Sequence, residues 1–200
     1  MTGPIIITIA SILYAGVHSL LASLEAKARA RRRFGPQADR WYRLAYNLFA
    51  GVSFVPILVL LVILPDKFLY RIDMPKLIFT SLGQLLGAVI IVVGILQTGV
   101  GSFIGLRQIW GTEEPPQSLG LVVQGLYRWM RHPLYTGGLL LIWFTPVMSL
   151  NLLTLFICLT IYLIVGARFE ERRLIHEFGE AYKRYMRRVP MLIPKKPRRK

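Results

Sequence analysis

Cysteine is almost absent from this sequence, which has only Cys158 among its 200 residues. A single cysteine cannot form a disulfide within the chain, and no group of histidine and cysteine residues has the spacing of a metal site. The sequence also lacks the phosphate-binding loop of nucleotide hydrolases and the Gly-x-Gly-x-x-Gly fingerprint that follows a strand in dinucleotide-binding domains. These absences exclude a disulfide framework and a soluble Rossmann-type enzyme.

Long hydrophobic runs are abundant, and they decide the fold class. The chain is 54% hydrophobic with a mean hydropathy of +0.49, and several windows approach the length needed to cross about 30 Å of hydrocarbon. We predict an all-α polytopic membrane helical bundle with five transmembrane helices and a C-terminal cytoplasmic amphipathic helix over 168–188. The expected spans are 4–24, 44–64, 77–98, 134–149 and 152–167. Because the loop between the last two is short, they should form an antiparallel hairpin.

Acidic residues are scarce, and the basic residues are grouped. The sequence has 10 acidic and 25 basic residues, and 22 of the 25 lie in a loop expected over 27–43, in 107–131 and in 168–200. In a soluble protein the net charge of +15 would suggest nucleic acid. Here the positive-inside rule explains it and predicts an outside N-terminus and a cytoplasmic C-terminus. Anionic lipid is the expected partner of these charges, and nucleic acid is not.

Three regions follow from these patterns. We predict a three-span N-terminal membrane region over 1–98, a region with most of the chemical motifs over 99–194, and a basic tail over 195–200. No basic residue precedes the first span, so we expect a retained span in a bacterial inner membrane and no cleaved signal peptide.

The strongest motif is Arg131-His132-Pro133-Leu134-Tyr135, directly before an apolar run. Pro133 suits the first turn of a helix, and a helix N-terminus with an arginine beside it can bind an anion such as a carboxylate. The alternative is that Arg131 reaches the lipid headgroups and His132 caps the helix.

A pair of carboxylates, Glu170 and Glu171, closes the last predicted span. Because both ends of the hairpin lie on one side of the membrane, His132 and Glu170 can face one pocket. The alternative for the carboxylates is ion pairing with a neighbouring basic residue, one of Arg168, Arg172 and Arg173.

Aromatic and histidine side chains complete the candidate set. Tyrosines gather at the same level, either as an interfacial belt or as a surface for a cationic or aromatic ligand; they are Tyr127, Tyr135, Tyr182 and Tyr185. His18 lies within the first span, where an ionisable residue is a functional candidate.

Residues 99–194 resemble the isoprenylcysteine carboxyl methyltransferase family, whose relatives include phospholipid and bacterial thiol methyltransferases of membranes. The resemblance rests on Gly125-Leu126-Tyr127, the 131–135 motif, Glu170-Glu171 and Phe178-Gly179. It also includes the later tyrosines and Val189-Pro190. The first half, with His18-Ser19 and Trp41-Tyr42-Arg43, is more weakly similar to NnrU-type membrane proteins.

The resemblance implies an enzyme that uses S-adenosylmethionine and no metal. The residues implied in cofactor binding are Gln108, Leu121, Val122, Tyr127, Arg131, His132, Pro133, Leu134, Tyr135 and Glu170. We expect Glu171, Arg168 and His18 to serve in catalysis, with Glu171 or His18 as general base where a neutral thiol or amine must lose a proton. The isoprenylcysteine enzymes carry an arginine at the register of Gly166, and this departure argues against a prenylcysteine substrate.

The expected function is methyl transfer to a small or lipophilic acceptor, with a thiol favoured over a carboxylate or an amine. Two other classes stay open. A membrane reductase of the sterol reductase type would use NADPH, and an NnrU-like accessory protein would be non-catalytic and would not bind S-adenosylmethionine.

The grouping of basic residues generates a test of topology. A cysteine introduced into the 66–74 loop should react with an impermeant thiol reagent added to intact cells, and a cysteine introduced into 30–39 should not, because only the first loop is expected outside. The reverse labelling pattern would contradict the predicted orientation.

Overall fold

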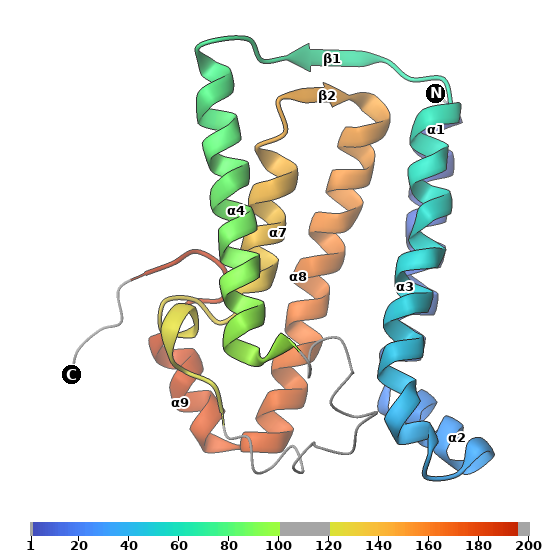
Figure 1. The fold of residues 1–200 in the computed structure, drawn as a ribbon, viewed down its shortest axis with the longest axis vertical. Coiled ribbons are helices and arrows are strands. Elements are labelled where there is room, and N and C mark those ends of the chain that lie inside the picture. The colour runs from blue at the N-terminus through green and yellow to red at the C-terminus, as the bar shows by residue number, and fades with distance from the viewer. Residues whose placement is uncertain (1, 101–120, 196–200) are drawn as a thin grey trace. The chain divides into compact units, whose positions relative to one another are not determined.

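The computed structural model describes residues 2–100 and 121–195 (Figure 1). The helices are α1 (Thr2–Ala22), α2 (Leu24–Phe34), α3 (Ala38–Ile63), α4 (Lys76–Thr98), α7 (Pro133–Trp143), α8 (Leu150–Phe178) and α9 (Glu180–Arg188), with a 3₁₀ helix at Gly125–Arg128. Two short strands, β1 (Phe68–Arg71) and β2 (Val147–Ser149), form a two-stranded sheet. The chain divides into two compact units, and α8 begins in the first and continues in the second.

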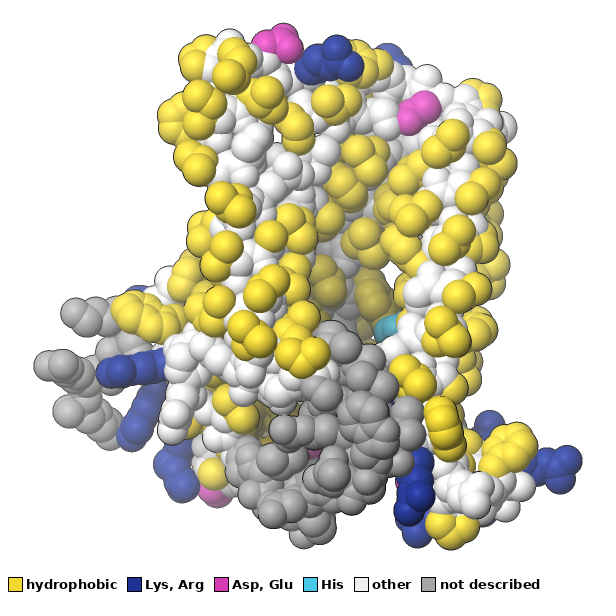
Figure 2. All heavy atoms as spheres, viewed as in Figure 1, with side chains coloured by type: hydrophobic (Ala, Val, Ile, Leu, Met, Phe, Trp, Pro, Cys, Tyr) yellow, Lys and Arg dark blue, Asp and Glu magenta, His cyan; other side chains and the backbone are white. Residues whose placement is uncertain are grey.

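Four of the described helices are long and apolar enough to cross a membrane, namely α1, α3, α4 and α8. The predicted all-α membrane bundle is therefore confirmed, and the protein is an integral membrane protein. Figure 2 shows hydrophobic side chains along the exposed faces of the long helices, as expected where helices face lipid.

The fourth predicted span, 134–149, is wrong as a full crossing. Its helix, α7, has 11 residues, which is about 16 Å of helix and too short for the hydrocarbon layer. The helix ends at Trp143, before Thr145-Pro146, because a residue that precedes proline disfavours helical backbone. Residues 147–149 then form β2 instead of a last helical turn.

Two predicted boundaries also change. Most of the basic 27–43 segment, expected as a loop, is helical: it spans α2 and the start of α3. Ser23 caps α2 by accepting a hydrogen bond from the backbone N–H of Ala26 at 3.1 Å, and three arginines complement the dipole of its last turn. The amphipathic helix predicted over 168–188 is interrupted at Gly179, whose φ of 55° is in the region that favours glycine.

The first unit contains Met1–Leu69 and Met148–Leu159. Its core is formed where α1, α3 and the start of α8 bury Ile7, Ile57 and Leu155. Near this core the side chain of Asn151 is fully buried and donates a hydrogen bond to the carbonyl of Pro65 at 3.2 Å.

Asp66 lies beside Asn151 in the first unit. Its carboxylate accepts a hydrogen bond from the backbone N–H of Asn151 at 3.0 Å. Slight burial would raise the pKa of Asp66, but hydrogen bonds from Ser149 and from nearby backbone N–H groups outweigh it, so that its pKa lies below the usual range.

The second unit contains Tyr70–Thr98, Pro116–Val147 and Thr160–Lys200. Within it α4 and α7 run side by side (Figure 1). They meet through Gly87 and Gly137: a Cβ at either position would lie 2.7 Å from the carbonyl oxygen of the other. Small residues of this kind let helix backbones approach closely in membranes. This contact fixes the start of α7, where the 131–135 motif lies.

The close approach of the two glycines generates a stability prediction. Gly137→Ala should destabilise the protein by about 1–3 kcal/mol because the added methyl group overpacks the contact with α4. Gly138→Ala is the matched control, because a Cβ there would meet only Leu163 at an ordinary 3.9 Å. Thermal unfolding in detergent should show a Tm several degrees lower for the first variant alone; equal Tm values would contradict this packing.

Candidate functional site

The backbone around His132 is tied to the segment that follows α9. The N–H groups of Arg131 and His132 donate to the carbonyls of Pro190 at 2.9 Å and Met191 at 3.1 Å. Pro133 occupies the first turn of α7, as predicted, and His132 precedes it without a side-chain capping bond. The motif therefore begins a helix and also joins two distant parts of the sequence.

A buried ion pair lies beneath the motif. The guanidinium of Arg131 binds one oxygen of Glu171 through both Nε and Nη2, each at 2.7 Å. Its Nη1 donates to the backbone carbonyls of Met186 and Val189. Both charged side chains are less than 10% exposed. The donors of Arg131 are thus used within the protein, and Arg131 has little left with which to hold a ligand carboxylate.

The imidazole of His132 lies between the two adjacent carboxylates and is 5% exposed. Its Nε2 is 3.2 Å from Glu171 Oε1, and its Nδ1 is 3.6 Å from Glu170 Oε2. The ring stacks on Tyr135 with a centroid distance of 5.2 Å, and the Tyr135 hydroxyl donates to Glu170 at 2.9 Å. Glu170 is 47% exposed and Glu171 only 4%, so the two neighbours have different environments.

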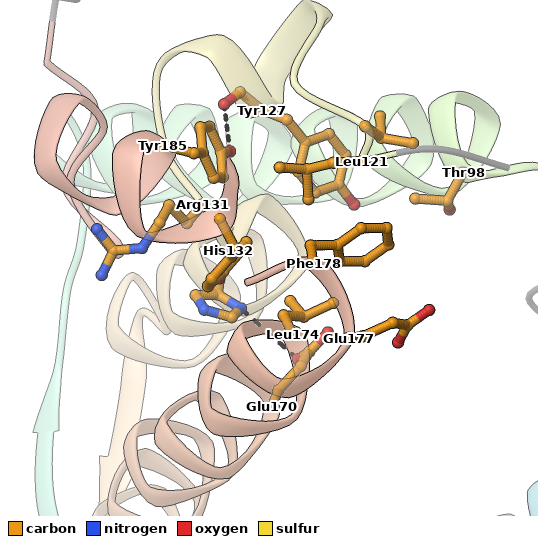
Figure 3. Close-up of a pocket in the computed structure, with 12 residues that line it drawn as sticks. Thr98, Leu121, Tyr127, Arg131, His132, Glu170, Leu174, Glu177, Phe178 and Tyr185 are labelled. Atoms are coloured by element: carbon orange, nitrogen blue, oxygen red, sulfur yellow. Dashed lines mark hydrogen bonds and ion pairs between the residues drawn. The ribbon is translucent and has the colours of Figure 1, made fainter. Parts of the chain in front are cut away.

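A cavity of about 270 Å³ opens beside His132 and Glu170 (Figure 3). All of its lining residues belong to the second unit. They are Thr98, Leu121, Val122, Tyr127, Arg131, His132, Glu170, Leu174, Glu177, Phe178, Tyr182 and Tyr185. This volume is near the lower end of the range of small-molecule pockets, and a mainly apolar wall with a few polar groups is typical of them.

Three tyrosines on the cavity wall stay neutral at ordinary pH. Burial, reinforced by the charge of Glu170, raises the pKa of Tyr127 to about 12. Burial also raises the pKa of Tyr182 and of Tyr185. The Tyr185 hydroxyl donates to the backbone carbonyl of Tyr127, which fixes the 3₁₀ helix against α9. The wall therefore presents neutral rings and hydroxyl groups.

The structure brings together six of the residues predicted for cofactor binding, which line the cavity: Leu121, Val122, Tyr127, Arg131, His132 and Glu170. Pro133, Leu134 and Tyr135 lie in the first turn of α7, next to the cavity and outside its lining. Gln108 lies outside the described residues.

The residues predicted for catalysis are not gathered at the cavity. Glu171 is buried in its pair with Arg131, which argues against the general-base role predicted for it. The sequence suggested Arg168, Arg172 or Arg173 as the ion-pair partner, but the partner of Glu171 is Arg131. Arg168 is exposed on α8, outside the lining. His18 lies on α1 in the first unit, where its Nε2 is 2.7 Å from the Tyr46 hydroxyl.

Tyr182 and Tyr185, which also line the cavity, were predicted only as members of the tyrosine cluster. Four further lining residues were not predicted for the site: Thr98, Leu174, Glu177 and Phe178. The last three follow Glu170 at four, seven and eight positions along α8, which is the spacing of one helical face. Helical periodicity could therefore have found them, whereas nothing in the sequence placed Thr98 against residues 121–132.

Comparison with known proteins assigns the chain to a family. The family model described as "Protein of unknown function (DUF1295)" matches residues 3–189. The chain belongs to this family. Within the match lie both the 131–135 motif and the Glu170-Glu171 pair, so the family's shared region includes the whole described lining of the cavity.

Several curated relatives are methyltransferases by name. The chain is 46% identical over 95 residues to methanethiol S-methyltransferase 2 of Bradyrhizobium diazoefficiens, covering 46% of this chain and 36% of that protein. It is 38% identical over 121 residues to methanethiol S-methyltransferase of Crocosphaera subtropica, covering 60% and 47%. It is 32% identical over 166 residues to protein-S-isoprenylcysteine O-methyltransferase of Xenopus laevis, covering 76% and 51%.

These comparisons confirm the resemblance to the isoprenylcysteine methyltransferase group, while the NnrU-type likeness stays a prediction. The chain spans about half the length of the curated relatives it matches. No solved structure shows a significant match. In the described part of the chain, no group of three or more histidine, cysteine, aspartate or glutamate residues could hold a metal ion.

The contrast between the two carboxylates generates a prediction. Glu171→Ala should lower the free energy of unfolding by about 3–5 kcal/mol, because it leaves the buried guanidinium of Arg131 without its counter-charge. Glu170→Ala, on the adjacent and half-exposed position, should cost no more than about 1 kcal/mol. Unfolding in mixed detergent micelles measures both, and equal losses would show that Glu171 is not the structural member of the pair.

Proposed function

We propose that this protein is an S-adenosylmethionine-dependent methyltransferase of the membrane that acts on a small or lipophilic acceptor, most directly a thiol. The observation that carries the proposal is the cavity in which His132, Glu170 and the tyrosines converge beside the apolar helices α7 and α8. The named relatives support it, because several are methanethiol S-methyltransferases.

The donor set of the cavity fits the proposed cofactor. Apolar side chains from Leu121 and Val122 and the ring of Tyr127 suit a nucleoside, and the carboxylate of Glu170 suits a positively charged ligand. When bound, S-adenosylmethionine supplies a methyl group that is already activated by its sulfonium. The protein then has mainly to position the two reactants and to keep water out.

The residues of the site divide this work. Glu170 presents a carboxylate to the cavity, oriented by Tyr135 on one side and by His132 on the other. Glu171 binds the imidazole on the side away from the cavity, and Arg131 fixes Glu171 in place. Arg131 also lines the cavity, but its donors are already used within the protein. Where a thiol must lose its proton, the described groups best placed to accept it are Glu170 and His132, since both line the cavity.

The roles proposed for Arg168 and His18 rest on the sequence alone. We propose that His18 lies on the path by which the acceptor enters, because it is an ionisable side chain inside a membrane helix. We also propose an inner-membrane location with a cytoplasmic C-terminus. The exposed basic residues of α9, which are Lys183, Arg184, Arg187 and Arg188, would then face anionic lipid headgroups.

The cofactor proposal is tested by calorimetric titration of the detergent-purified protein with S-adenosylmethionine and, separately, with NADPH. His132→Ala and Glu170→Ala should each weaken S-adenosylmethionine binding at least tenfold, about 1.4 kcal/mol, by removing a polar contact in a partly dry site. His176→Ala and Glu180→Ala are controls on exposed residues outside the cavity lining. Binding of NADPH alone would favour a reductase, and binding of neither ligand would favour a non-catalytic protein.

The acceptor is tested by transfer of a radiolabelled methyl group to a panel of thiols, amines and prenylcysteine analogues. We expect small hydrophobic thiols to be preferred, in line with the names of the relatives and with glycine at position 166. His18→Ala should lower transfer without changing cofactor affinity. Preference for the prenylcysteine analogue, with His18→Ala unchanged, would overturn both expectations.

A further inference from the structure

Glu177 is a carboxylate on the cavity wall for which the function described above has no role. It lies on α8, is exposed, and lines the cavity together with Leu174 and Phe178 (Figure 3). Among the described residues no hydrogen-bond donor or cation is paired with it, in contrast to Glu180, which binds Lys183 at 2.7 Å. As far as the described residues go, the carboxylate of Glu177 is therefore open to a ligand.

The second carboxylate on this wall is already engaged. Glu170 accepts a hydrogen bond from Tyr135 and lies beside His132. Glu177 is two helical turns further along the same face of α8, about 10 Å along the helix axis. The two glutamates therefore reach the cavity wall from two different turns of α8.

No free positive charge on the described wall balances Glu177. Arg131 is the one lysine or arginine of the described lining, and its donors are taken by Glu171 and by two backbone carbonyls. The other nitrogen base of the lining, His132, lies between Glu170 and Glu171. A carboxylate facing a partly apolar cavity favours a ligand that brings a positive group within about 4–6 Å. The charge that complements Glu177 is therefore expected on the ligand.

We propose that Glu177 binds the ammonium group of the amino-acid end of the adenosyl cofactor and of its demethylated product. This inference rests on the proposed function. An ammonium group suits this position because Glu177 is exposed, so that the ligand's own carboxylate can turn to solvent and avoid the two glutamates. Glu177 is then a specificity-determining residue that selects ligands with an amino-acid tail.

The test compares two ligands that differ in that tail. S-adenosylhomocysteine carries the ammonium group, and 5′-methylthioadenosine has the same nucleoside and thioether but no amino-acid end. Glu177→Gln should weaken S-adenosylhomocysteine binding about fivefold, a size expected for an exposed charge pair, and should leave 5′-methylthioadenosine unchanged. Glu177→Asp should retain part of the affinity, and Glu180→Gln serves as the control.

Calorimetry at low and high salt adds an independent readout. The affinity of the unaltered protein for S-adenosylhomocysteine should fall as salt rises, and Glu177→Gln should reduce that dependence. An equal loss for both ligands would place Glu177 on the nucleoside and overturn the proposal, as would no loss for either. If the unaltered protein binds neither ligand, the proposed function fails and the assignment of Glu177 fails with it. If the unaltered protein binds both ligands and Glu177→Gln changes neither affinity, the assignment alone fails.

Discussion

The buried pair of Arg131 and Glu171 is the interaction on which the rest of the site depends. It joins the segment just before α7 to the last third of α8, and through Met186 and Val189 it also holds the end of α9. A pair of buried charges adds little net stability by itself, yet the loss of either partner leaves an uncompensated charge that is costly. The pair therefore fixes one arrangement of three segments that lie far apart in the sequence.

The arrangement gives two adjacent glutamates opposite tasks. Successive residues on a helix point about 100° apart, so Glu171 turns inward to Arg131 while Glu170 turns to the cavity. His132 contacts both carboxylates and so links the buried Glu171 to the exposed Glu170. The side chains around the cavity are thus held in place by contacts within the protein, and preorganisation of this kind lowers the cost of binding a ligand.

Much of the fold could be predicted from the sequence, because four of the five predicted spans coincide with described helices that are long and apolar enough to cross a membrane. The fourth run misled the prediction: hydropathy continues through 134–149, but the chain leaves the helix before Pro146. The basic segment over 27–43 also reads as a loop by charge, although arginine and alanine are good helix formers and α2 occupies part of it.

The residues of the site could likewise be predicted only in part. The 131–135 motif and Glu170 could be found because local sequence and family resemblance both pointed to them. The partner of Glu171 could not, because three arginines near it in sequence were equally plausible and the true partner lies 40 positions away. Glu177 was overlooked as one glutamate among many charges, although its spacing of seven from Glu170 puts it on the same face of α8, and its place on the cavity wall distinguishes it.

The most direct test of this account is a double-mutant cycle on the buried pair, with unfolding free energies measured in mixed detergent micelles. Arg131→Met and Glu171→Met should each be strongly destabilising, and the double variant should lose at least about 1 kcal/mol less than the sum of the two, because it leaves no buried charge unpaired. Additivity within about 0.5 kcal/mol would show that the two side chains act independently, and would contradict the claim that their pairing organises the site.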